Sequence, residues 1–254
     1  MNATTNVGTI DWTTRTGGRL TSAERRRLLL DLARAHAGNA GGRFALLVRM
    51  NRGRNAHVAQ ERLAPPDSRL TRAARDAAMA VLPSTLLDHS HRTYVFARAL
   101  GELEQLDVDA ELLFAAAMLH DAGLAQASGC EDFTLTSARM ARVVSERVGL
   151  STAATATLQT AITMHHSPRV TVAAGPVAYL LAAGAGVDVV GLRCWDLPRS
   201  ILLDAVDAHP RDGFKEYFTQ AWAHEAVRVP QGRAALLRRY GAFRAAIALA
   251  PFDE

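Results

Sequence analysis

The sequence predicts an all-α protein, and three observations support this prediction. The composition is 49% hydrophobic but only 6% aromatic, with abundant alanine and leucine, which favours helices packed through small aliphatic side chains. Apolar residues follow a helical pattern over most of the chain, and capping residues, glycines or prolines separate the segments. With 254 residues the chain is long enough for one large domain, and we expect about seven or eight helices.

The N-terminal part of the chain is expected to be an extension with one clear helix. Residues 1–20 are rich in threonine and glycine, which is typical of an irregular lead-in. A helix is predicted from Thr21, because Thr21 and Glu24 stand at the spacing of a capping box. Gly38 is expected to end this helix, since glycine is common just past a helix C-terminus.

A domain boundary is predicted near Ser68. Residues 43–50 form either a short strand or a buried continuation of the preceding helix. Residues 51–68 contain the breakers "NRGRN" and "LAPPDS", so we expect a loop there. The sequence therefore divides into an arginine-rich N-terminal extension and linker, residues 1–68, and a helical domain, residues 69–254.

Helical segments fill the domain that follows this boundary. Asp109 is expected to be the N-cap of one helix. Another helix is expected to break near Gly184 and Gly186. Helices are predicted over residues 69–83, 85–106, 109–123, 134–149, 151–166, 175–191, 214–229 and 232–249.

Positive charge is concentrated near the N-terminus. Residues 1–76 hold 14 arginines and six acidic residues, a balance of +8, although the whole chain carries only +4. Such a segment can hold nucleic acid or phosphorylated ligands. No aromatic residues alternate with these arginines as stacking platforms, so we expect a solvated helix face and no nucleic-acid partner.

The two cysteines and the N-terminus indicate a cytoplasmic protein. Cys130 and Cys194 lie far apart and form no recognisable pair or zinc motif, which favours a reducing compartment. The N-terminus lacks the pattern of a signal peptide. No stretch of about 18 apolar residues is present, so we expect no membrane association.

The strongest functional signal is the adjacent pair His120 and Asp121 at the end of an apolar run, "AAMLHDAGL". Burying both groups is costly unless each finds a partner. Adjacent helical side chains point about 100° apart, but they can converge where the last turn loosens before Gly123. Imidazole and carboxylate groups together bind divalent metals. Further candidates for such a site are His89 and Asp188.

Four motifs, taken in order, resemble those of the HD-domain metal-dependent hydrolase superfamily. They are "DHSHRTYVFA", "MLHDAGL", "AITMHHSPRV" and "GAGVDVVGL", and the resemblance covers about residues 80–245. The best match is the cyanamide hydratase-like branch. The resemblance implies an HD-domain helical bundle that holds one divalent transition metal, with Zn first and Mn, Fe, Co or Ni as alternatives. The implied metal ligands are His89, His120, Asp121 and Asp188.

The sequence departs from that family after the His-Asp pair. Members usually carry Phe-Glu followed by a small residue and glycine, whereas this chain keeps Phe133 but has Thr134 in place of the acid. Thr136 and Ser137 stand near the position expected for the glycine. If the missing glutamate shapes the substrate pocket in relatives, the substrate of this protein is different.

His165 and His166 are candidates for catalytic roles. Two-metal members of the superfamily insert further histidines between the His-Asp pair and the final aspartate, but here the only candidates are adjacent. Since neighbours on a helix diverge, they are poorly placed to share one metal. We therefore favour a mononuclear site, with one of the two supporting the metal ligands or facing the substrate. A two-metal phosphodiesterase or a mixed-valence diiron oxygenase is the less favoured alternative.

Asp121 and Arg92 are the other predicted catalytic residues. A divalent metal lowers the pKa of bound water from about 15.7 towards 7, and Asp121 or a nearby carboxylate can orient that water or take its proton. Arg92 follows His89 by three residues and shares its helix face. There it would brace Asp121, receive an anionic substrate group or form an ordinary structural ion pair.

Two reactions on a small-molecule substrate fit such a site. Phosphomonoester hydrolysis needs Arg or Lys beside the metal, whereas hydration of a nitrile or cyanamide needs a tight apolar cavity. Arg92, and more weakly Arg169 and Arg193, favour an anion, while Thr134 argues against cyanamide itself. The alternative to an enzyme is a non-catalytic protein with the HD scaffold, which would act as a regulator or would bind nucleic acid or a protein partner. A homo-oligomeric assembly is also compatible with the sequence. Trp222 is expected to lie in the core or in an interface.

Overall fold

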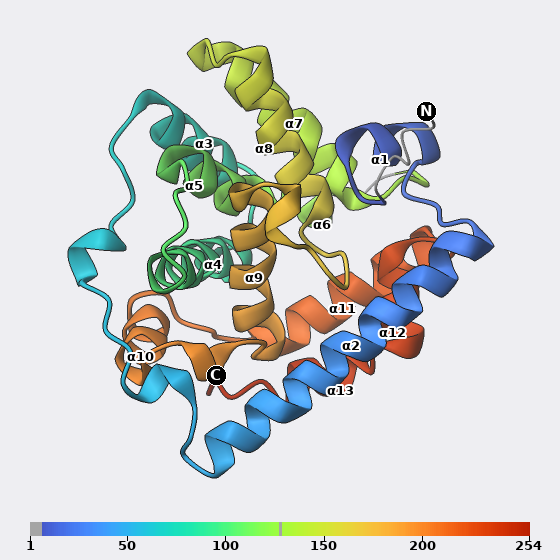
Figure 1. Ribbon diagram of the computed structural model, residues 1–254. Coiled ribbons are helices and arrows are strands. Elements are labelled where there is room, and N and C mark those ends of the chain that lie inside the picture. Colours follow the sequence, from blue (N-terminus) through green and yellow to red (C-terminus); the bar gives the residue numbers. More distant parts are fainter. Residues whose placement is uncertain (1–6, 127–128) are drawn as a thin grey trace.

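Helices make up all the regular structure of the described residues, 7–126 and 129–254, in this computed structural model (Figure 1). The predicted all-α fold is therefore confirmed. At the centre of the helical domain α4 (Ser84–Leu103) crosses α9 (Pro176–Val190), and this pair makes the most extensive contact between helices. The other helices of the domain are α3 (Arg69–Met79), α5 (Ala110–Leu119), α6 (Ala122–Ala125), α7 (Phe133–Val148), α8 (Thr152–Met164), α10 (Arg199–Ala208), α11 (Phe214–Arg228), α12 (Arg233–Tyr240) and α13 (Phe243–Ala248).

The interior of the domain is organised around α5. Its residues 112–119 are all buried, because α3, α4, α7, α8 and α9 contact this helix. As predicted, Asp109 is the N-cap, and its side chain accepts hydrogen bonds from the backbone N–H groups of Glu111 and Leu112 at 3.0 Å each. Since α5 is buried to its last residue, the two residues that follow Leu119 also lie in the interior.

The N-terminal extension contains α1 (Ile10–Thr16) and α2 (Ser22–Leu47). The predicted start of α2 is confirmed, because Thr21 and Glu24 form both hydrogen bonds of a capping box. The predicted stop at Gly38 is wrong, and so is the strand alternative for residues 43–50, because the helix continues to Leu47. A glycine in a helix interior weakens the helix by only about 1 kcal/mol, which tertiary contacts readily exceed.

Close contacts seat α2 on the helical domain. A Cβ atom at Gly42 would lie 2.1 Å from the Trp195 ring, so only glycine allows this approach. The neighbouring Arg43 donates hydrogen bonds to the backbone carbonyls of Val190 and Leu249 at 3.2 Å each. The described part of the arginine-rich extension is therefore packed against the domain instead of standing apart from it.

The predicted break in α9 is wrong. The helix runs without interruption through Gly184 and Gly186. A Cβ atom at Gly184 would lie 2.3 Å from the backbone oxygen of Thr93, so this glycine lets α9 cross close to α4. Gly184 thus serves helix packing, and neither glycine ends the helix.

More helices are present than the expected seven or eight. Residues 1–20 were predicted to be irregular, yet α1 lies within them and begins after Thr9, whose side chain accepts a hydrogen bond from Trp12 N–H. Residues 1–6 of that segment lie outside the described residues. α10 is also unpredicted, and Gly241 divides the helix predicted over residues 232–249 into α12 and α13.

The described residues agree with the expectations for cysteines. Cys130 is exposed, Cys194 is buried, and both are free thiols. None of the helices described is long and apolar enough to cross a membrane.

Candidate metal centre

The junction between α5 and α6 brings His120 and Asp121 together. α5 ends at Leu119, His120 is its C-cap, and Asp121 leaves helical geometry with φ −104° and ψ 9° before α6 begins. Gly123 is required in this turn, because a Cβ there would lie 1.9 Å from the backbone oxygen of Phe133. The expectation that the two side chains converge at a loosened helix end agrees with this geometry.

Three imidazoles face the Asp121 carboxylate. His89 from α4 and His120 lie with their Nε2 atoms 3.1 Å apart, and these atoms are 3.5 Å and 3.4 Å from Asp121 Oδ2. His165, just after α8, places its Nε2 atom 3.5 Å from the other oxygen, Oδ1. His89, His120 and Asp121 each offer an atom that lies within 4.8 Å of the others, which is the arrangement of a metal-binding group.

The hydrogen bonds of these residues fit a divalent metal. His120 and His165 each direct Nδ1 to a backbone oxygen three residues earlier, at 2.7 Å, and His89 directs Nδ1 to Asp188 at 2.6 Å. With the proton on Nδ1, all three Nε2 lone pairs are free to bind a cation. Both oxygens of Asp121 are buried, and neither has a hydrogen-bond partner among the described residues. Ligand atoms around a tetrahedral zinc lie about 3.3 Å apart, close to the observed separations.

The protonation states also favour a cation. Burial lowers the pKa of His120 to about 3, so its ring is neutral near pH 7. Burial alone would raise the pKa of Asp121, but the surrounding imidazoles, led by His120, outweigh it and hold the pKa below the ordinary value. Neutral imidazole and ionised carboxylate are the forms that bind a metal.

Asp188 lies behind His89 and not among the converging atoms. Its Oδ2 atom accepts from His89 Nδ1 at 2.6 Å and from Arg92 at 2.9 Å. Its Oδ1 atom accepts from Arg92 at 2.8 Å and from Arg211 at 2.5 Å. In this arrangement the carboxylate that the family resemblance assigns to the metal contacts His89, and its charge is balanced by two buried guanidinium groups.

Arg92 differs from its expected position. Its guanidinium is fully buried and contacts Asp188, not Asp121. The remaining donor, NH1, bonds the backbone oxygens of His209 and Pro210 at 2.7 Å each. The first two expectations for Arg92 are therefore wrong, because all its hydrogen-bonding nitrogens are engaged within the protein. The third, a structural ion pair, agrees with its contact to Asp188.

His165 and His166 diverge, as expected for neighbours at a helix end. His166 turns away from Asp121 and places Nε2 3.4 Å from Asp132 Oδ2. Asp132 is held by the Thr134 hydroxyl at 2.7 Å and by Arg233 at 3.0 Å. Thr134 thus stands where the family usually has an acid, and a buried carboxylate is supplied two residues earlier.

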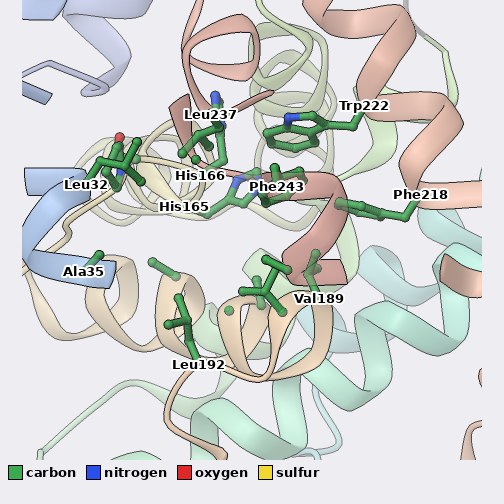
Figure 2. Close-up of a pocket in the computed structure, with 18 of the residues that line it drawn as sticks. Leu32, Ala35, His165, His166, Val189, Leu192, Phe218, Trp222, Leu237 and Phe243 are labelled. Carbon is green, nitrogen blue, oxygen red and sulfur yellow. The ribbon is translucent and has the colours of Figure 1, made fainter. Parts of the chain in front are cut away.

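A cavity of about 160 Å³ opens beside the metal-binding group. Figure 2 shows Leu32 and Ala35 of α2 on one side of it and Phe218 and Trp222 of α11 on another. Trp222 was expected in the core or an interface, and it lines this cavity as well as being buried. Further apolar lining residues are Val189, Val190, Leu192, Leu237 and Phe243.

No arginine or lysine is among the described residues that line the cavity. Arg169 extends towards Asp31 at 4.0 Å on the surface, with more than half of its side chain exposed. Arg193 bonds Asp196 and Tyr179 at 3.0 Å each. Neither of these two predicted anion-binding candidates belongs to the site.

Sequence reasoning missed Arg211, Asp132 and the outer wall of the cavity. Neither Arg211 nor Asp132 was among the candidate site residues. Their partners, Asp188 and His166, lie 23 and 34 positions away in the chain. No local pattern marks such contacts, because only the packing of α7, α9 and the α10–α11 connection creates them.

Comparison with known proteins adds one finding. The protein-family model described as "HD domain" matches residues 86–216, slightly more than half of the chain. The matched part contains the three residues of the metal-binding group, together with Asp188, His165 and His166. No curated protein matches the chain.

Proposed function

The chain belongs to the HD-domain metal-dependent hydrolase superfamily, and on that premise we propose that it acts on a small, uncharged and largely apolar molecule, with hydration of a nitrile as the favoured reaction. One observation carries this choice. The cavity beside His89, His120 and Asp121 is lined mainly by aliphatic and aromatic side chains and by no described arginine or lysine. A site of this kind selects for shape and apolar surface, with few polar groups to orient the substrate.

His89, His120 and Asp121 would hold the metal, which we propose to be zinc first among Zn, Mn, Fe, Co and Ni. When bound, a divalent metal makes water a usable nucleophile near neutral pH and polarises the group under attack. Asp188 keeps the His89 ring in the orientation that points Nε2 to the site, and Arg92 and Arg211 fix Asp188 in turn.

His165 is the residue best placed to move a proton. Its Nδ1 atom bonds the Ile162 carbonyl, so its Nε2 atom, beside Asp121 Oδ1, carries a free lone pair. During hydration the oxygen of water bonds to the nitrile carbon, and one proton passes to His165 Nε2. The carbon–nitrogen triple bond becomes a double bond, and the nitrogen takes that proton back from His165 to give the imidic acid. The remaining O–H proton then moves to the nitrogen, and the product is the amide. No atom beyond the nitrile and one water is needed.

Phosphomonoester hydrolysis is less well supported. A phosphate requires cationic partners in the site. Arg92 and Arg211 are bound to Asp188, and Arg233 is bound to Asp132. A scaffold that only binds a partner is also less well supported, because Asp121 retains two unpartnered buried oxygens beside a ligand-sized cavity.

Within the cyanamide hydratase-like branch, we propose a substrate larger than cyanamide. Cyanamide is small and polar, whereas Phe218, Trp222 and Phe243 provide aromatic surface along the cavity. The replacement of the usual acid by Thr134 points in the same direction.

A substrate panel tests this proposal. The purified protein is reconstituted with zinc, and in parallel with the other four metals, and incubated with benzonitrile, butyronitrile, cyanamide and 4-nitrophenyl phosphate. We expect amide formation from the two organonitriles, detected by mass spectrometry, and its loss in the Asp121→Ala variant. Phosphate release that exceeds amide formation, and that depends on Asp121, would overturn the choice of an uncharged substrate.

A further inference from the structure

His166 is a buried polar side chain without a hydrogen bond. It lines the cavity, and only 8% of its surface is exposed. Neither ring nitrogen has a hydrogen-bond partner among the described residues. A buried donor or acceptor left without a partner destabilises a protein, so such a group is a candidate to bind a ligand or water.

A rigid network holds His166 in this position. Asp132 Oδ2 lies 3.4 Å from His166 Nε2, and Asp132 itself bonds Thr134 and Arg233. Arg233 also donates to the Thr163 backbone oxygen at 2.6 Å. Every member of this network is at least nine-tenths buried, so the ring is held firmly at the wall of the cavity.

The position of Asp132 determines what His166 can offer. A carboxylate beside Nε2 favours the tautomer with the proton on Nε2, which leaves Nδ1 as an acceptor. Burial, which Arg233 reinforces, lowers the pKa of His166 to about 4, so the ring stays neutral near pH 7. The group available to a ligand is therefore the lone pair of a neutral imidazole.

We propose that His166, positioned by Asp132, is a second polar subsite of the cavity that accepts a hydrogen bond from an N–H or O–H group of the substrate. The proposal deepens the proposed function, because it names a feature of the substrate of that same site. The substrate is then an apolar molecule with two polar ends, one that reacts beside Asp121 and one that donates to His166.

The surroundings of His166 define the body of such a molecule. Its ring centroid lies 5.1 Å from that of Phe133 and 5.7 Å from that of Trp222. The ring of His165, which faces Asp121, is 5.2 Å away. This separation is about the width of one aromatic ring, so a ring carrying a nitrile and a donor group in meta positions suits both ends.

Equilibrium binding tests the subsite without any need for turnover. The probes are 3-hydroxybenzonitrile and 3-aminobenzonitrile, which carry a donor, and benzonitrile, which does not. Binding to the zinc-loaded protein is measured by calorimetry. We expect at least tenfold tighter binding of the donor probes to the wild type, and loss of this preference in His166→Phe. The matched control is His36→Phe, since His36 is an exposed histidine at the same cavity.

A spectroscopic measurement on the wild type covers the case in which His166→Phe fails to fold. Nitrogen NMR of the imidazoles should show His166 as the neutral Nε2–H tautomer, with an Nδ1 resonance that shifts on addition of 3-hydroxybenzonitrile but not of benzonitrile. An unchanged Nδ1 resonance, or equal binding of the probes, including absence of binding by all three, would overturn the subsite. Donor preference without any amide formation would instead retain the subsite and reject nitrile hydration.

Discussion

The two ends of the cavity come from different parts of the chain and are held together by different forces. The polar end, with His89, His120 and Asp121, lies within the residues that match the HD domain. Most of the apolar residues labelled in Figure 2 lie outside the matched range. Leu32 and Ala35 precede residue 86, and the residues of α11–α13 follow residue 216. On the proposed function, the family domain would provide the metal chemistry, and the flanking helices would help to select the molecule that reaches it.

The polar end and the apolar wall of the cavity are held in place by different interactions. The polar end is fixed by buried charges, with Asp188 bonded to His89, Arg92 and Arg211 at separations of 2.5–2.9 Å. The apolar wall is fixed by side-chain contact and by the close approach of α2 at Gly42. Changes at the polar end should therefore reduce stability and metal binding, whereas changes at the wall should alter substrate selection first.

The largest effect is expected from Asp188→Asn. Removing this charge leaves Arg92 and Arg211 buried without a counter-ion, which should lower the free energy of unfolding by about 3–5 kcal/mol. Because the orientation of His89 is weakened, zinc affinity should fall by about 10–100-fold. Urea unfolding and zinc competition measure the two effects, and Asp196→Asn, at a partly exposed pair with Arg193, serves as the control. Complete loss of zinc with unchanged stability would make Asp188 a direct ligand.

The next effect is expected at the apolar wall. Ala35→Phe should fill part of the cavity and reduce amide formation from benzonitrile at least tenfold, with zinc content unchanged. Ala37→Phe lies on the same helix but is exposed and does not line the cavity, so its activity should stay near that of the wild type. Equal activity of both variants would show that α2 does not limit access to the metal.

Paired glycine substitutions examine how α2 is seated. Gly42→Ala should destabilise the protein by about 1–3 kcal/mol, because the new methyl group meets the Trp195 ring. Gly38→Ala meets nothing within 4 Å and should stabilise the helix by up to about 1 kcal/mol. Thermal unfolding of both variants gives the sign of each change, and the same sign for both would contradict the close approach at Gly42.

A pH dependence of stability is expected from His166, where the two ends of the cavity meet. His166 has an ordinary pKa near 6.5 when unfolded and a pKa of about 4 in the folded protein, because it is buried. Between these values the unfolded chain binds a proton that the folded protein does not, so stability decreases as the pH falls. The loss should be about 2 kcal/mol at pH 5 relative to pH 7.5. Urea unfolding of the metal-free protein measures it, and His166→Phe should show a weaker dependence than His36→Phe.

The local signals in the sequence predicted the helix starts well. Thr21 and Asp109 cap the helices that they were expected to begin, because a cap depends only on the next three residues. Gly38 and Gly184 were interpreted by the same local logic and gave wrong helix ends. At Gly184 the deciding contact is with Thr93 on α4, which no window of a few residues contains.

The candidate site shows the same difference between local signals, which the sequence reveals, and contacts between distant segments, which it does not. The adjacency of His120 and Asp121 is visible in the sequence, and His89 was a further candidate, which the structure places beside them. The orientation of Asp188 towards His89 Nδ1 depends in part on Arg211. This arginine contacts Asp188 from the α10–α11 connection, and the local sequence does not show that contact. The apolar wall was also beyond prediction, since Leu32, Trp222 and Phe243 come from three helices that meet only in the folded chain.

Elemental analysis of the purified protein beside the Asp121→Ala variant tests the central claim most directly. Since His89, His120 and Asp121 form one metal-binding group, we predict about one equivalent of a transition metal in the wild type and almost none in the variant. Two equivalents in the wild type would contradict a single site and bring His165 into a second one. Absence of metal from the wild type after reconstitution would contradict metal-dependent chemistry altogether.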